Sequence, residues 1–306
     1  MTELLDGGYE LTLFNRGNHE NPFADDPRVS QYTGDRKSET ALKNAKEAVE
    51  PDVVVDCVAY YPGEVEVATR VFDGVDAYVF VSSGAAYERG HLPKREGETP
   101  LRPCTDEEAV DDSAETYGAR KAAGDRAVFD AAGRGVRAMS IRPTIVYGPH
   151  DYTGRLRYWI DRIRNDDRVL VPGDGTNIHH LVSVSNTVRA IRTVAEDGTP
   201  GEVYNVGDRQ VLPLGRLLRR IATAVDSDVE FVTANERELA EAELSMEAFP
   251  LYSPEAHLLS TAKLHSIGWE PVPVGEAIQR TVTAPSAGNR DPGPERTATE
   301  QVLKTL

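Results

Sequence analysis

The stretch AYVFVSSGAAY, residues 77–87, decides the fold class. Its first five residues are apolar, which is typical of a strand buried on both faces of a parallel sheet, and a Ser-Gly turn follows them. The stretch DVVVDC (52–57) has the same character. Between the two, Val65–Phe72 has helical spacing, so strand, helix and strand alternate along the chain.

The alternation continues on both sides of this unit. Leu11–Phe14 and Val136–Ile141 are predicted strands, and Ser38–Val49 and Ser113–Ala132 are predicted helices. A polar loop runs from the end of the central stretch to about residue 112. This order predicts an α/β fold built on a doubly wound parallel sheet.

The regular alternation of strand and helix loosens after Pro143. We expect residues 1–150, with a returning segment near 176–206, to form the sheet domain, and residues 151–282 to form a smaller mixed α/β region. Residues 283–306 are rich in Pro, Gly and charge, which predicts a disordered tail. In the second region the predicted elements are the helices Leu156–Ile163 and Leu214–Val225 and the strand Val203–Val206.

The charge balance limits the possible partners. The net charge of the 306 residues is -16, whereas nucleic-acid binding depends on clustered cations. Seven lysines stand against 27 arginines. An acidic surplus with scarce lysine favours the hypothesis of a protein from a halophile's cytosol, where salt screens the self-repulsion. The alternative is an ordinary acidic protein.

The cysteines and histidines indicate the compartment and the kind of site to expect. Cys57 and Cys104 cannot form a disulfide framework, and they suit a reducing cytoplasm. The adjacent His179 and His180 lack the spacing that brings metal ligands together, so we expect no metal site. We find neither a secretory signal nor a membrane span in the sequence, and expect no membrane partner.

The first candidate site is YGARK (117–121), inside a predicted helix. Residues four apart share one helical face, so the Tyr117 phenol and the Lys121 ammonium project into the same space. A nearby cation favours the phenolate and lowers the phenol pKa, which suits proton exchange with a substrate hydroxyl or carbonyl. A chance Tyr-Lys pair on a helix is the alternative.

Two strand ends could complete this site. The predicted strand 77–82 runs into hydroxyl side chains, and hydroxyls at the carboxyl end of a strand can hold or polarise a substrate oxygen. IRPTIVYGP (141–149) is another strand end, which turns through Pro and Gly. Each alone also fits an ordinary turn.

Together, in this order, these segments resemble the extended short-chain dehydrogenase/reductase superfamily, in its NAD-dependent epimerase/dehydratase branch. The resemblance covers nearly the whole chain and implies a Rossmann-like fold. The segments that carry it are VVDCVA (54–59), VSSGAAY (81–87), YGARK (117–121), RPTIVYGP (142–149), GDG (173–175), VYNVG (203–207) and KLHSIGWEP (263–271).

The resemblance implies hydride transfer at a hydroxyl or carbonyl carbon with NAD or NADP, on a small-molecule substrate such as a nucleotide sugar. It implies that Tyr117 is the acid/base, that Lys121 lowers its pKa and holds the nicotinamide ribose, and that Ser83 orients the reacting oxygen. A homodimer through the helix 113–132 is usual in the family. The cofactor contacts implied are Asn15, Arg16, Asp35, Arg36, Val58, Ala59, Tyr60, Lys121, Pro143, Thr144 and Val146.

The beginning of the chain departs from the family pattern. Family members start with a strand, a glycine-rich turn and a helix, whereas MTELLDGGYE (1–10) matches only the end of that helix. Losing the strand would leave a gap in the sheet, and losing the turn would remove backbone N–H groups from the cofactor pyrophosphate. We expect that Met1 is an internal or misassigned start; the alternative is a true truncation with weak or absent cofactor binding.

Other departures bear on specificity. The strand 11–14 ends in Asn15-Arg16, where an arginine can accommodate a 2′-phosphate, so we favour NADP. Ser183 and Asn186 stand where the family usually has His and Asp, which argues against a close tie to the sugar-nucleotide epimerases. The alternative function is a non-catalytic, cofactor-sensing or RNA-binding relative. The arginines that could grip a phosphate are Arg155, Arg157 and Arg162.

Overall fold

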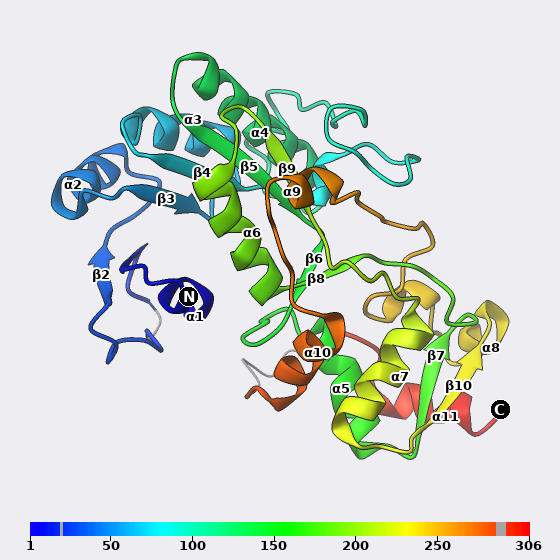
Figure 1. The fold of residues 1–306 in the computed structure, drawn as a ribbon. Helices are drawn as coiled ribbons and strands as arrows, with labels where there is room; N and C mark the ends of the chain where they lie inside the picture. The colour runs from blue at the N-terminus through cyan, green and yellow to red at the C-terminus, as the bar shows by residue number, and fades with distance from the viewer. Residues whose placement is uncertain (19–20, 286–291) are drawn as a thin grey trace. The chain divides into compact units, whose positions relative to one another are not determined.

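The computed structural model describes residues 1–18, 21–285 and 292–306 and divides into two compact units (Figure 1). Unit 1 consists of residues 1–144, 187–206 and 260–270, and unit 2 of residues 145–186, 207–259 and 271–306. Helix α6 (Val184–Asp197) begins in unit 2 and ends in unit 1. In these described residues no helix combines the length and apolar character needed to cross a membrane.

Unit 1 is built on parallel strands in two sheets. A four-stranded sheet has the order β3-β4-β5-β9, and β1 pairs with β2 in a second sheet. The elements are α1 (Thr2–Asp6), β1 (Leu11–Asn15), β2 (Val29–Thr33), α2 (Glu39–Val49), β3 (Val53–Asp56), α3 (Pro62–Val71), β4 (Ala77–Val81), the 3-10 turn η1 (Gly84–Ala86), α4 (Tyr117–Gly133), β5 (Ala138–Pro143), β9 (Val203–Val206) and α9 (Ala262–Ser266).

The core of unit 1 surrounds β4. Its first four residues are buried, because helices α3 and α4 pack on the sheet and on each other. Val65 of α3 and Val128 of α4 contribute fully buried side chains to the same cluster as Phe80. Helix α2 begins where Ser38 Oγ accepts the Ala41 N–H at 3.2 Å. The predicted α/β fold with a parallel sheet is therefore confirmed.

A cavity of about 680 Å³ lies within unit 1 between the edge strands β1 and β3. Apolar side chains from both strands line it, among them Leu13, Phe14 and Val54. In the four-stranded sheet β3 is an edge strand, and its three valines are only half-buried. In the described residues β1 and β3 belong to separate sheets, and this cavity lies between them.

Helix α4 depends on a glycine where it meets η1. A Cβ atom added to Gly118 would lie 2.4 Å from the Ala85 carbonyl oxygen, which is closer than van der Waals contact allows. We expect Gly118→Ala to lower the free energy of unfolding by about 1–3 kcal/mol, because backbone must shift on one side. Gly133→Ala, in the last position of the same helix, meets open space and should raise it by about 0.5–1 kcal/mol.

Denaturant unfolding of the two variants in one buffer measures this difference. Equal changes in the unfolding free energy for Gly118→Ala and Gly133→Ala would show that the backbone at the start of α4 can shift with no loss of stability.

Unit 2 packs its own helices around an indole. Trp159 is fully buried and stacks on Phe249 with ring centroids 6.2 Å apart, and its Nε1–H donates to the Pro250 carbonyl at 2.8 Å. The elements of this unit are β6 (Ile145–Tyr147), α5 (Arg155–Asn165), β7 (Arg168–Pro172), β8 (Leu181–Ser183), α7 (Leu214–Val225), β10 (Glu230–Ala234), α8 (Glu236–Ala240), the 3-10 turn η2 (Met246–Ala248), α10 (Val274–Thr283) and α11 (Arg296–Leu303).

The C-terminal segment differs from the expected disordered tail. Residues 296–303 form helix α11, and its Val302 is buried in the core of unit 2. An apolar face on this short helix outweighs the polar composition that suggested disorder. The part of the predicted tail at residues 286–291 lies outside the described residues.

Candidate active site

Lys121 is the centre of the candidate site in unit 1. Its side chain is 2% exposed, and its Nζ donates to the Ala59 carbonyl at 2.8 Å and the Val81 carbonyl at 2.9 Å. Val81 ends β4, and Ala59 lies three residues after the end of β3, so the ammonium joins two segments at the carboxyl edge of the sheet. Burial lowers the pKa of Lys121 to about 8, against the opposing charges of Asp56 and Asp125.

Tyr117 is the first residue of α4, one turn before Lys121. The Lys121 ammonium lies 5.9 Å from the centroid of the Tyr117 ring and 5.2 Å from that of Tyr60. The two tyrosine rings are 6.4 Å apart. The structure therefore brings together the predicted Tyr-Lys pair, Tyr60 and Ala59. Residues 113–116, predicted as the first turn of this helix, precede it instead.

The serine segment meets the start of α4. Ser83 caps η1, with its Oγ accepting the Ala85 N–H at 3.2 Å, and η1 packs on α4. Ser82 is buried and points the other way, donating from Oγ to Asp125 Oδ2 at 2.9 Å. Ser83 is partly exposed, whereas Ser82 is buried.

Arg36 is committed to an ion pair. It contacts the Asp56 carboxylate at the end of β3, and its Nη1 lies 3.4 Å from Glu64. Asp56 also accepts the Tyr78 hydroxyl at 2.7 Å. Arg36 thus lies beside the carboxyl end of β3, but its charge is already used there by Asp56 and Glu64.

The remaining predicted cofactor contacts of unit 1 lie at strand ends. Asn15 ends β1 and its Oδ1 accepts the Gly17 N–H at 2.8 Å, while Arg16 is exposed. Asp35 follows β2 and accepts the Lys37 N–H at 2.9 Å. Val58 is exposed, as a contact to a ligand outside the sheet requires.

The end of β5 carries the other predicted contacts. Pro143 ends this strand, and Thr144, which follows, donates its N–H to the Val206 carbonyl at 2.9 Å. The Thr144 Oγ1 is buried without a hydrogen-bond partner among the described residues, so a donor or acceptor remains to be satisfied there. Val146 lies on β6, in unit 2.

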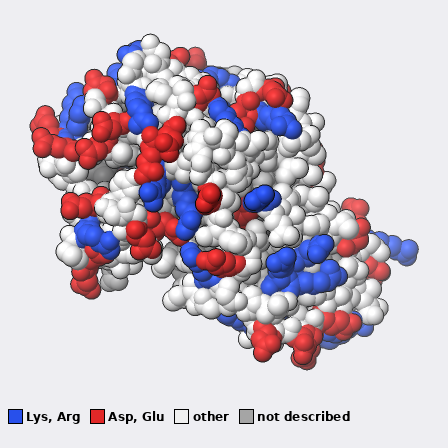
Figure 2. Space-filling model, in the orientation of Figure 1, with Lys and Arg blue, Asp and Glu red and all other residues white. Residues whose placement is uncertain are grey.

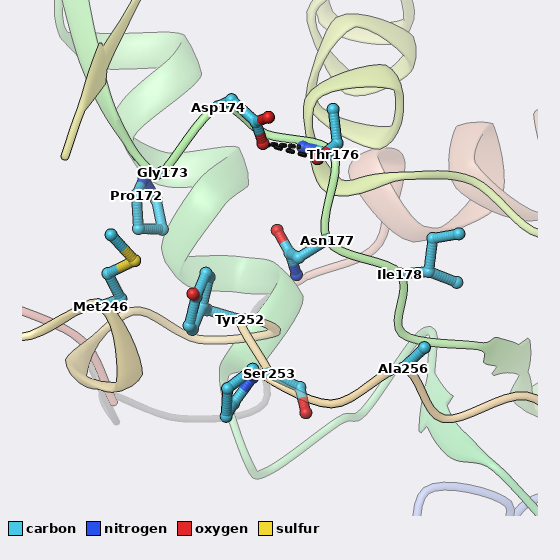
Figure 3. Close-up of a pocket in the computed structure, with 11 residues that line it drawn as sticks. Pro172, Gly173, Asp174, Thr176, Asn177, Ile178, Met246, Tyr252, Ser253 and Ala256 are labelled. Carbon is cyan, nitrogen blue, oxygen red and sulfur yellow. Dashed lines mark hydrogen bonds between the residues drawn. The ribbon is translucent and has the colours of Figure 1, made fainter. Parts of the chain in front are cut away.

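Unit 2 contains a separate pocket of about 470 Å³ (Figure 3). Asn177 projects into it from the segment after β7, facing Met246 and Tyr252 (Figure 3). The Asn177 Nδ2 donates to the Leu251 carbonyl at 3.2 Å, and its Oδ1 is buried without a partner among the described residues. An aromatic ring and a thioether beside an amide whose oxygen has no partner suit packing against a flat heterocycle.

The residues Ser183 and Asn186 have a structural role in unit 2. Asp208 Oδ1 accepts the Ser183 backbone N–H at 3.1 Å and Asn186 Nδ2 at 2.8 Å, and its Oδ2 accepts the Tyr147 hydroxyl at 2.8 Å. His180 donates from Nε2 to the Asp208 carbonyl, and burial lowers its pKa. This buried cluster fixes β6 and β8 beside each other.

One of the three candidate phosphate-binding arginines is used in packing. Arg162 is buried, its guanidinium lies 3.7 Å from the centroid of the Tyr158 ring, and it donates to the Pro294 carbonyl at 2.7 Å. These contacts remove Arg162 from the set available to a substrate phosphate. Arg155 is partly exposed and donates to Thr153 Oγ1.

Sequence reasoning missed two groups. Asp125 and Arg142 form a buried ion pair beneath the site, and Asn177 with Tyr252 lines the pocket of unit 2. The spacing of four between Lys121 and Asp125 was a usable signal, because it places both on one face of α4. The pocket has no such spacing signal, since its sides come from segments 172–178 and 246–256, which are far apart in the sequence.

The sequence model of the NAD dependent epimerase/dehydratase family matches residues 1–207. The chloroplast stem-loop binding protein of 41 kDa b of Arabidopsis thaliana is 24% identical over 88% of this chain and 70% of its own length. The mouse dTDP-D-glucose 4,6-dehydratase is 25% identical over 68% of this chain, which spans about half (55%) of that relative.

Solved structures show the same fold. dTDP-glucose 4,6-dehydratase from Bacillus anthracis, in complex with NAD, superposes with a TM-score of 0.69 at 19% identity, over 92% of this chain and 90% of that one. UDP-glucose 4-epimerase from Thermotoga maritima, with UDP-glucose, gives a TM-score of 0.70 at 19% identity, over 92% of both chains.

Proposed function

The chain belongs to the NAD-dependent epimerase/dehydratase family, and on this premise we propose that it modifies a nucleotide sugar by hydride transfer at a hydroxyl or carbonyl carbon. The observation that carries the proposal is the Tyr117–Lys121 pair, which the structure holds at the ends of two parallel strands. We further propose that unit 1 holds the cofactor and that unit 2 holds the substrate nucleotide.

Tyr117 acts as the acid/base in this proposal. The Lys121 ammonium favours the phenolate, so the Tyr117 oxygen can take a proton from a substrate hydroxyl or return it to a carbonyl. Ser83 donates a hydrogen bond to the same substrate oxygen. A bound nicotinamide cofactor supplies the hydride acceptor and donor.

Unit 1 fits the nicotinamide ribose of a cofactor better than it fits the pyrophosphate. The ribose and nicotinamide would meet Lys121, Ala59 and the buried, unsatisfied Thr144 hydroxyl. The pyrophosphate lacks a comparable site at α3, because Glu64 already accepts the Tyr60 N–H at 2.9 Å at that helix start. We therefore expect weak binding, with Arg16 favouring NADP over NAD.

The pocket of unit 2 supports the choice of substrate. Its Tyr252 ring and Met246 thioether suit packing against a uracil or thymine, and Asn177 beside them carries a buried Oδ1 with no partner among the described residues. The relatives named as dTDP-glucose dehydratases and the structure with UDP-glucose act on or bind nucleotides with such bases.

Ligand-dependent melting in molar salt tests the proposal. Because only the folded state binds, a cofactor or nucleotide sugar at ten times its Kd should add about 1.4 kcal/mol to the unfolding free energy, a rise of a few degrees in Tm. We expect NADP, then NAD, to act at millimolar concentration, and UDP-glucose or dTDP-glucose independently of them. If neither cofactor raises Tm at millimolar concentration, the proposed cofactor site is wrong. If either raises Tm already at micromolar concentration, the expectation of weak pyrophosphate binding is wrong.

A second candidate function is RNA binding or cofactor sensing without catalysis. It is favoured by the Arabidopsis relative, which is named for stem-loop binding and aligns over 88% of this chain. The net charge of -16 disfavours it, and on the face in Figure 2 acidic side chains stand among the basic ones. A stem-loop RNA that shifts Tm in the same assay at physiological salt would favour this alternative.

A further inference from the structure

A buried ion pair lies beneath the Tyr-Lys pair in unit 1. Arg142 Nε donates to Asp125 Oδ2 at 2.8 Å, and the two side chains are 2% and 0% exposed. The cost of removing two charges from water often cancels the attraction between them, so such a pair is weak evidence for a role in stability alone. Its position suggests another role.

The Asp125 carboxylate links three segments of the candidate site. It lies on α4 one turn after Lys121, so both side chains are on one face of the helix. Its Oδ2 also accepts the hydroxyl of Ser82, the neighbour of Ser83. Through Arg142 it reaches β5 directly before Pro143.

Arg142 is fixed from its other side. Its guanidinium lies 4.5 Å from the centroid of the Tyr87 ring, and the Tyr87 hydroxyl donates to Asn205 Oδ1 at 2.8 Å. Asn205 belongs to β9, the strand next to β5. The ion pair is therefore anchored to the sheet, and a movement of Asp125 would have to displace packed aromatic and amide groups.

We propose that Asp125, held in place by Arg142, is a positioning residue that keeps the Lys121 ammonium charged and aimed at the site and fixes the Ser82–Ser83 strand end against α4. The part that Asp125 plays in catalysis rests on the proposed function.

The electrostatics of Lys121 make the claim measurable. Burial lowers its pKa to about 8, while Asp56 on β3, Asp125 on α4, Cys57 after β3 and Glu64 on α3 oppose this. The rings of Tyr60, Tyr117 and Phe80 also face the ammonium. Removing the negative charge of Asp125 should therefore make Lys121 easier to deprotonate.

Carbon-13 NMR of the lysine side chains tests this without cofactor or substrate. The chain has seven lysines, so the ε-carbon signals are few, and Lys121→Met identifies the relevant one. We expect Asp125→Asn to lower the pKa of Lys121 by about half a unit or more. Asp125→Glu keeps the negative charge, so the pKa of Lys121 in this variant should stay close to its wild-type value. Asp130→Asn, an exposed change on the same helix, should leave it unchanged.

If Asp125→Asn does not fold because Arg142 is left unpaired, the double variant with Arg142→Gln removes both charges. A fall in the Lys121 pKa in the same direction is expected, and it should be smaller because the positive charge of Arg142 is lost as well. A Lys121 pKa that stays at its original value in the folded variant overturns the inference. The proposed function fails separately: an inert wild-type enzyme with a shifted lysine in Asp125→Asn would refute catalysis but not the coupling.

Discussion

Tyr117→Phe is expected to lower turnover of a nucleotide sugar by a factor of about 10²–10⁴, which is the range that one positioned acid/base contributes. The substitution removes the phenolic hydroxyl but keeps the ring that lies 6.4 Å from the Tyr60 ring and 5.9 Å from the Lys121 ammonium. Cofactor binding should change less than threefold, because Lys121 and the strand ends remain. Product formation followed by NMR of the sugar measures the effect.

Tyr152→Phe is the matched control, since this tyrosine is 70% exposed in unit 2. It should retain full turnover. Equal turnover of Tyr117→Phe and the wild type would refute Tyr117 as the acid/base. Stem-loop RNA binding that is equal in Tyr117→Phe and the wild type, with no turnover in either protein, would support the non-catalytic alternative.

Lys121→Met is expected to abolish turnover at little cost to the stability of the fold. At neutral pH the buried ammonium of Lys121, with its pKa near 8 instead of 10.5, costs the folded state about 3 kcal/mol. Methionine has a similar length and carries no charge. The Ala59 and Val81 carbonyls lose this donor, at a cost of about 1–3 kcal/mol each, so a gain of about 1 kcal/mol at most remains.

The pH dependence of stability shows the same effect. The folded-state pKa of Lys121 is below the unfolded-state value, so between about pH 8 and 10.5 the unfolded chain binds more protons. Wild-type stability should therefore rise with pH through this window, and the rise should be smaller in Lys121→Met. Lys43→Met, a change at an exposed lysine, serves as control. A fall in Tm of Lys121→Met at pH 7 would show that the ammonium stabilises the fold.

The sequence predicted the strands and helices that pack on both faces. Strand β4 and strand β3 lie within one residue of their expected limits, and α7 and β9 match at both ends. Their apolar runs report burial directly. The strand β2 was missed because VSQYT alternates weakly and is largely exposed, so no apolar run marks it.

The site was predictable only where neighbours in sequence become neighbours in space. Tyr117 and Lys121 are four residues apart on one helix, so their meeting follows from helical geometry. The pairing of Arg36 with Asp56 joins residues from two strand ends, and no local pattern foretells it. The same holds for the Arg142 contact with Asp125, which requires the helix to be packed on the sheet.

The cavity between β1 and β3 has a consequence for the order in which the protein opens. A two-stranded sheet is marginal by itself, and β1 shares no ladder with the four-stranded sheet. Amide hydrogens of β1 and β2 should therefore exchange with solvent through a local unfolding that leaves β4 and β5 intact. Asn15 and Arg16 lie at the end of β1 and just after it, so a ligand that touches them would also stabilise this strand against opening. Preference for one cofactor over the other would then depend on local stability as well as on direct contact.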